Sequence, residues 1–109
     1  LRLIRELVAF PTVSRDSNLQ LIDYLRELLR PLDADLRLTF DDDRRKANLF
    51  ATLGPRGGSG IVLSGHTDVV PVDGQDWTSD PFTVSERDGR LYGRGTSDMK
   101  SFIACVLSL

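Results

Sequence analysis

The spacing of apolar residues predicts two helices at the start of the chain. A short amphipathic helix is indicated by four residues at helical intervals: Leu1, Ile4, Leu7 and Val8. It should end before Pro11, because a proline disfavours the helical conformation in the residue that precedes it. A second helix should begin near Ser17, which can form a capping box with Gln20, and should stop at Pro31. Its apolar face has five members: Leu21, Ile22, Leu25, Leu28 and Leu29.

The middle of the chain alternates between strand patterns and turn patterns. Apolar and polar side chains alternate over residues 36–40, and residues 47–53 form a second strand-like stretch. The charged residues 41–46 between them are typical of a solvated loop. The continuous apolar run Ile61–Leu63 is typical of a strand that is covered on both faces. The glycine-rich residues 54–60 precede that strand rather than opening a helix, so they predict a turn and not a phosphate-binding loop.

A hairpin and a final helix complete the pattern. Asp88 and Gly89 tolerate the positive backbone angles of a tight turn, and they predict a hairpin between residues 82–87 and 90–92. Four apolar residues at helical spacing indicate the final helix: Phe102, Ile103, Val106 and Leu107. Helices on both sides of a strand-rich middle predict an α/β fold in which a layered sheet carries helices on both faces. At 109 residues, the chain should form one small domain, residues 1–109.

Composition and charge narrow the classes of partner. The chain has 14 basic and 16 acidic residues, a net charge of −2, and no stretch dense in Lys or Arg. This balance argues against nucleic acid or an anionic membrane surface as the main partner. No apolar run approaches the roughly 20 residues that a membrane-spanning helix requires. The single cysteine, Cys105, cannot form an internal disulfide, and no signal-peptide pattern is present, so we expect a cytoplasmic protein that acts on a small molecule.

The first segment that could carry chemistry is Ser64–Pro71, which follows the predicted strand Ile61–Leu63. Ligands of α/β sheets bind at the carboxyl ends of strands. His66 and Asp68 are two residues apart, so an extended backbone points both side chains to the same face. A metal-bound imidazole needs an acceptor on its other ring nitrogen, and Asp68 could supply that acceptor for His66. Taken alone, however, this spacing favours an ordinary hydrogen-bonded histidine over a metal ligand.

The second such segment is Tyr92–Lys100, which lies directly before the final helix. The simplest role for Asp98 in this segment is to cap the first amides of that helix. Gly93 and Gly95 resemble the start of a dinucleotide-binding loop, but Asp98 occupies the third glycine position and would repel a pyrophosphate. A carboxylate in a glycine-rich loop can instead bridge two cations, which makes Asp98 opposite His66 a candidate metal ligand.

Three other residues are expected to have structural roles. Cys105 should be a buried, inert thiol, since no second histidine is present to activate it. Lys100 should be a solvated surface lysine. Trp77 should anchor the long loop after Pro71, because aromatic rings bury large areas.

Together, the two segments resemble the paired metal motifs of the zinc aminoacylase and carboxypeptidase superfamily. The likeness rests on Ser-Gly-His-Thr-Asp-Val-Val-Pro at 64–71 and Gly-Arg-Gly-Thr-Ser-Asp-Met-Lys at 93–100, and it extends over essentially the whole chain. Ser101 departs from the family pattern, which commonly has glycine at this position. Within the superfamily, Pro-Thr-Val-Ser at 11–14 and Trp-Thr-Ser-Asp-Pro-Phe at 77–82 favour a deacetylase of N-acetylated amino acids. A desuccinylase or a dipeptidase would keep the same metal motifs.

The resemblance implies a fold, a cofactor and roles for three residues. The chain would be the N-terminal portion of a zinc-peptidase-like catalytic domain that binds two divalent metal ions, either zinc or cobalt. His66 would ligate one metal, Asp98 would bridge the two metals, and Asp68 would be the catalytic partner that orients His66. The reaction would be hydrolysis of an amide bond in a small N-acylated amino acid, carried out by a full-length homodimer.

Parts of the implied machinery are absent from these 109 residues. The family's general base belongs to a pair of adjacent glutamates, and a second histidine is also missing. The glutamates of this chain are isolated from one another: Glu6, Glu27 and Glu86. We therefore expect a piece of a longer protein, with the base, the remaining ligands and a dimerisation domain beyond Leu109. The alternative is a noncatalytic α/β remnant or binding domain in which His66 and Asp98 are structural.

Overall fold

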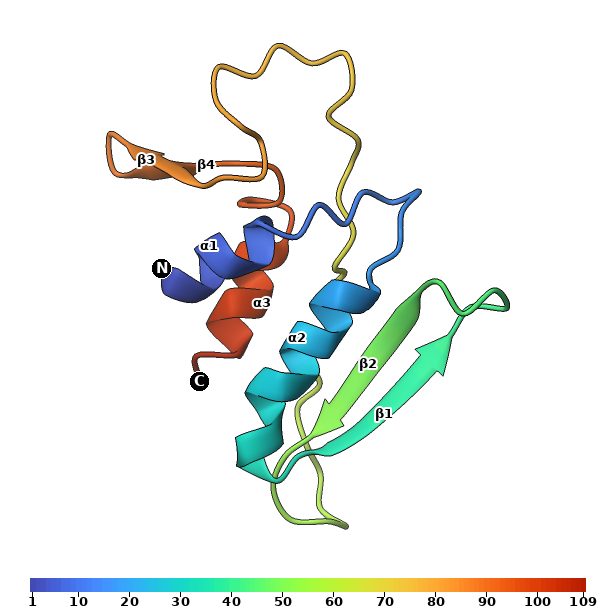
Figure 1. The fold of residues 1–109 in the computed structure, drawn as a ribbon. Coiled ribbons are helices and arrows are strands. Elements are labelled where there is room, and N and C mark those ends of the chain that lie inside the picture. The colour runs from blue at the N-terminus through green and yellow to red at the C-terminus, as the bar shows by residue number, and fades with distance from the viewer. The chain divides into compact units, whose positions relative to one another are not determined.

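A computed structural model describes all 109 residues as a mixed assembly of helices and strands (Figure 1). The elements follow one another as α1 (Arg2–Val8), α2 (Leu19–Leu29), a 3-10 turn η1 (Arg30–Leu32), β1 (Asp35–Phe40), β2 (Ala47–Thr52), β3 (Ser85–Arg87), β4 (Arg90–Tyr92) and α3 (Lys100–Val106). They divide into two compact units. We call Asp16–Val62 the helix–hairpin unit, and Leu1–Arg15 together with Leu63–Leu109 the two-segment unit.

The helix–hairpin unit forms from residues that are close in the sequence. Strands β1 and β2 pair antiparallel, and α2 packs against β2. The apolar face predicted for α2 is confirmed, since four of its five residues are buried and Leu28 is half-buried: Leu21, Ile22, Leu25 and Leu29. Asn18 joins the helix start to the strand, because its carboxamide accepts a hydrogen bond from the Ala47 N–H and donates one to the Ala47 carbonyl, both at 2.9 Å.

The predicted capping box at the start of α2 is wrong. The helix begins at Leu19 with Asn18 as its N-cap, and the Asn18 side chain makes no capping hydrogen bond. The Ser17 hydroxyl accepts a hydrogen bond from the Leu19 N–H at 3.3 Å, while the Asn18 carboxamide is occupied by Ala47. At the other end, α2 stops at Leu29, and Pro31 lies inside the 3-10 turn that follows.

The predicted hairpin turn and loops are confirmed. Asp88 and Gly89 connect β3 to β4 with φ of 51° and 68°, the positive values expected of this pair. Residues 41–46 form the loop between β1 and β2, and residues 54–60 contain turns and bends but no helix. None of the helices is long and apolar enough to cross a membrane.

The strand predicted at Ile61–Leu63 is not formed. These side chains are 89%, 74% and 49% exposed, and no other segment pairs with them. A strand covered on both faces needs neighbouring strands and covering helices, and the chain supplies neither here. The strands instead form two separate two-stranded antiparallel sheets, so the layered sheet with helices on both faces is not confirmed.

The two-segment unit is held by contacts between its two ends. Helices α1 and α3 pack together (Figure 1). Val13 forms a parallel bridge with Val69, and both side chains are buried. The face predicted for α3 is only partly correct: Ile103, Val106 and Leu107 are half-buried, whereas Phe102 is 38% exposed. The buried apolar residue of this helix is Ala104, which lies outside the predicted face. The prediction of a buried Cys105 is wrong, since this thiol is exposed.

Candidate metal centre

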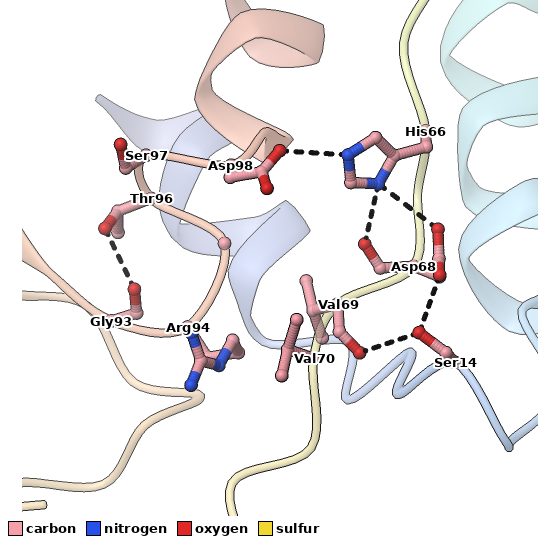
Figure 2. Close-up of a pocket in the computed structure, with 11 residues that line it drawn as sticks. Ser14, His66, Asp68, Val69, Val70, Gly93, Arg94, Thr96, Ser97 and Asp98 are labelled. Atoms are coloured by element: carbon pink, nitrogen blue, oxygen red, sulfur yellow. Dashed lines mark hydrogen bonds and ion pairs between the residues drawn. The ribbon is translucent and has the colours of Figure 1, made fainter.

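His66 lies between two acidic residues (Figure 2). Its Nδ1 atom is 2.9 Å from the backbone carbonyl of Asp68 and 3.2 Å from Oδ1 of the same residue. Its Nε2 atom is 2.9 Å from Oδ1 of Asp98. Both ring nitrogens therefore face oxygen acceptors: Nδ1 faces two atoms of Asp68, and Nε2 faces the carboxylate of Asp98.

The two sequence segments approach each other because glycines replace side chains at the contact points. A Cβ atom on Gly65 would lie 3.2 Å from Cε of Met99 and 3.2 Å from Cδ1 of Phe102. On the opposite segment, a Cβ on Gly95 would lie 3.0 Å from Cγ1 of Val69. Gly95 also has a φ of 93°, a conformation that L residues rarely adopt. Small residues at both points therefore allow His66 and Asp98 to meet.

Asp68 is itself held by a serine. The Ser14 hydroxyl donates a hydrogen bond to Oδ2 of Asp68 at 2.7 Å, which leaves Oδ1 facing the His66 ring (Figure 2). No pattern in the sequence marks Ser14 apart from its place in the Pro-Thr-Val-Ser stretch, because its partner lies 54 residues away.

Electrostatics favour a charged pair at this site. The hydrogen bond to the Asp68 carbonyl, and then the interaction with Asp98, raise the pKa of His66 above its ordinary value. The hydrogen bond from Ser14, followed by the attraction of His66, lowers the pKa of Asp68. The side chains are about half exposed for His66 and Asp68 and 78% exposed for Asp98, so a ligand can reach all three.

The donor set fits a divalent cation in part. Two ligands of one tetrahedral zinc ion lie about 3.4 Å apart, given bonds of about 2.0–2.2 Å, so Nε2 of His66 and Oδ1 of Asp98 need to separate by only a few tenths of an ångström. Asp68 supplies the acceptor that a metal-bound imidazole requires on its other nitrogen. No group of three or more His, Cys, Asp or Glu residues is arranged to hold a metal ion, so these residues alone form an incomplete centre.

A small cleft opens beside these groups. It has a volume of about 170 Å³ and is lined by Ser14, His66, Asp68 and Asp98 together with residues 69–70 and 93–97. Trp77 does not line it. Its Nε1 donates to Oε1 of Gln75 at 2.9 Å, and the Arg94 guanidinium lies 5.3 Å from its ring centroid. These contacts support the predicted role of Trp77 as an anchor of the loop.

The prediction that Lys100 is a solvated surface lysine is wrong. Its side chain is fully buried, and its Nζ donates a hydrogen bond to the Phe10 carbonyl at 2.5 Å. Burial lowers the pKa of Lys100 to about 8. The carbonyl that receives the hydrogen bond lies 90 residues earlier in the chain, so no local pattern could reveal this contact. Lys100 thereby ties the first turn of α3, next to Asp98, to the segment that follows α1.

Comparisons with known proteins agree with the resemblance seen in the two motifs. The chain is 43% identical to the acetylornithine deacetylases of Photorhabdus laumondii and Proteus mirabilis, and 40% identical to that of Shigella sonnei, each over 98% of the chain. It spans 29–30% of the length of these relatives. Residues 62–109 match the peptidase family M20/M25/M40. The matched residues include His66, Asp68 and Asp98, so the portion that aligns with this peptidase family also contains the candidate metal centre.

Proposed function

We propose that this chain is the N-terminal portion, residues 1–109, of the catalytic domain of a metal-dependent deacetylase. The enzyme removes the acetyl group from N2-acetyl-L-ornithine and releases L-ornithine and acetate, a step of arginine biosynthesis. The observation that carries the proposal is the pairing of His66 Nε2 with Asp98 Oδ1 at 2.9 Å inside the stretch that matches the peptidase family. The identity of 40–43% to acetylornithine deacetylases supports this substrate.

In this proposal the residues of the chain hold and orient the metal ligands. His66 would hold one divalent ion through Nε2, Asp98 would be the ligand shared by that ion and a second one, and Asp68 would keep the proton of His66 on Nδ1. Zinc fits this nitrogen and oxygen donor set, and cobalt is the alternative. When bound, the metals lower the pKa of water and stabilise the negative charge that develops on the amide oxygen. The general base, the remaining ligands and the homodimer contacts belong to the rest of the full-length protein.

Substitution of the two proposed ligands tests the metal centre. In the full-length protein, His66→Ala and Asp98→Ala should each lose bound zinc and reduce kcat by at least about 100-fold, the scale lost with one group that stabilises a transition state. Metal content is measured after dialysis, and Asp42→Ala is the matched control, because it removes an exposed carboxylate from the loop between β1 and β2. Unchanged zinc content and activity in either ligand variant would reject the site and favour a noncatalytic binding domain.

A separate assay tests the substrate. The full-length protein should hydrolyse N2-acetyl-L-ornithine with a higher kcat/KM than N-succinyl-diaminopimelate or a dipeptide. The metal motifs are shared among these activities, so ligand variants cannot distinguish them. A preference for the succinylated compound or the dipeptide would retain the metal centre and replace the proposed substrate.

A further inference from the structure

We propose that Ser14 is a positioning residue of the metal centre: its hydroxyl fixes Asp68, and Asp68 in turn fixes the ring of His66. This inference rests on the proposed metal site and adds to it a residue outside both metal motifs. Ser14 lies 54 positions before Asp68 in the sequence, and the two meet through a hydrogen bond of 2.7 Å between Oγ and Oδ2 (Figure 2).

The single hydroxyl proton of Ser14 is directed to the carboxylate. The Val69 carbonyl also lies near this hydroxyl, at 3.2 Å, but it already accepts the backbone N–H of Ser14 at 3.0 Å. The bond to Asp68 is shorter and has a charged acceptor, and hydrogen bonds to charged groups are the stronger ones. Ser14 therefore donates its backbone N–H to the Val69 carbonyl and its hydroxyl to the Asp68 carboxylate.

The two oxygens of Asp68 have separate partners. Ser14 holds Oδ2, and Oδ1 lies 3.2 Å from Nδ1 of His66. The Asp68 side chain is 52% exposed, so without an anchor its carboxylate would rotate and exchange its partners for water. With Oδ2 held, Oδ1 stays beside the ring and Nε2 stays directed at Asp98.

The backbone that carries Ser14 is fixed by buried neighbours. Val13 and Val69 are 5% and 2% exposed and form a bridge between the two segments. The buried Thr12 donates its hydroxyl to the Thr67 carbonyl at 2.6 Å, and its own carbonyl accepts the Val69 N–H at 2.9 Å. Because these contacts hold the two residues that precede Ser14, the Ser14 hydroxyl reaches Asp68 from a preorganised position.

The experiment compares three single variants of the full-length protein. Ser14→Ala deletes the hydroxyl. Ser14→Thr keeps it and adds a methyl group at an exposed position. Ser108→Ala is the matched control, since Ser108 donates its hydroxyl to the Ala104 carbonyl and does not line the cleft. Zinc affinity is measured by competition with a chelator, and kcat and KM are measured with N2-acetyl-L-ornithine.

The expected effect is smaller than that of a residue bound directly to a metal ligand. Loss of such a partner weakens metal binding by roughly 10–100-fold, and Ser14 acts one step further out, so Ser14→Ala should weaken zinc binding by about threefold to tenfold. kcat should fall by a similar factor with KM nearly unchanged, whereas Ser14→Thr and Ser108→Ala should match the parent protein. Equal zinc affinity in Ser14→Ala and the parent overturns the proposal.

A double variant tests whether Ser14 acts through Asp68. Once Asp68→Ala has removed the carboxylate, adding Ser14→Ala should cause no further loss of zinc affinity. Additive losses would mean that Ser14 acts by another route, and the proposal would be wrong. If His66→Ala and Asp98→Ala leave zinc affinity unchanged, the proposed metal site itself fails. If those two variants weaken binding and Ser14→Ala does not, only the role of Ser14 fails.

Discussion

The helix–hairpin unit and the two-segment unit are stabilised in different ways. In the former, α2 and the β1–β2 pair bury apolar side chains that come from one continuous stretch, Asp16–Val62. In the latter, polar contacts join positions that are far apart, such as Ser14 with Asp68 and Lys100 with Phe10, which are separated by 54 and 90 residues. Both units bury apolar side chains, but only in the two-segment unit do directed hydrogen bonds between distant residues determine the geometry around His66.

The candidate metal ligands lie in the unit with the less regular structure. His66 is in an extended segment without strand pairing, and Asp98 lies in turns before α3. Their side chains are 48% and 78% exposed, whereas Leu21 in the other unit is fully buried. A metal ligand must be accessible, so the contacts of its neighbouring residues, rather than its own burial, determine its position. Substitutions in the helix–hairpin unit should therefore change the free energy of unfolding without changing zinc affinity, whereas substitutions around the cleft should change zinc affinity.

The largest effect on stability is expected from Leu21→Ala in the helix–hairpin unit. Leu21 has no exposed surface, and replacing a buried leucine with alanine costs about 2–5 kcal/mol through lost burial and the cavity that remains. Chemical denaturation of the full-length protein measures this loss. Zinc affinity of the folded protein should not change, because Leu21 is not one of the residues that line the cleft. A parallel fall in zinc affinity would show that the two units are not independent.

Gly95→Ala should affect both stability and metal binding. The new Cβ would lie 3.0 Å from Cγ1 of Val69 and 3.1 Å from Cδ of Lys100, at a residue with φ of 93°. Overpacking of this kind costs about 1–3 kcal/mol, and relief of the clash would shift the loop that carries Asp98. The free energy of unfolding and the zinc affinity should therefore both fall.

Gly74→Ala is the matched control for that variant. Gly74 also has a positive φ, 71°, but a Cβ added there meets no atom within 4 Å. It reproduces the backbone strain without the clash, so zinc affinity should stay at the parental value. If both alanine variants lost zinc affinity equally, backbone strain alone would explain the loss. The clash of a Cβ at Gly95 with Val69 and Lys100 would then have no part in it.

The same contrast explains which parts of the fold the sequence predicts. The hairpin at Asp88 and Gly89 and the buried face of α2 depend on neighbouring residues, and both predictions are confirmed. Ile61–Leu63 has the composition of a buried strand but lacks the paired neighbours that a strand needs, so composition alone was insufficient. Local sequence patterns therefore predict structure that depends on neighbouring residues. They do not predict whether a segment pairs as a central strand, because that depends on other segments.

For the candidate site, too, the sequence predicts what depends on neighbouring residues and misses contacts between distant ones. The two-residue spacing of His66 and Asp68 correctly placed both side chains together, and the glycine-rich segment correctly brought Asp98 near His66. Ser14 and Lys100 were missed because a serine and a lysine have no pattern that marks a distant partner. A residue that supports a site from another segment becomes visible only when the contact itself is known.

The smallest effect is expected in the loop between β1 and β2, where one carboxylate stabilises a turn. Oδ1 of Asp41 accepts the N–H groups of Arg45 at 2.7 Å and Lys46 at 2.8 Å, and the Lys46 contact is the main cause of the lowered pKa of Asp41. Because the pKa is lower in the folded state, the carboxylate contributes stability above its unfolded pKa of about 4, and this contribution is lost as the pH falls through the folded value.

Asp41→Asn should therefore lower the thermal unfolding temperature slightly at neutral pH, and its difference from the parent should shrink as the pH falls below about 4. The unfolding temperature of both proteins is followed between neutral pH and the acid limit of folding. Asp42→Asn removes one negative charge from the same loop without breaking these two hydrogen bonds, so it controls for net charge. If the difference between Asp41→Asn and the parent were independent of pH, the stabilisation would come from the hydrogen-bond geometry and not from the charge of the carboxylate.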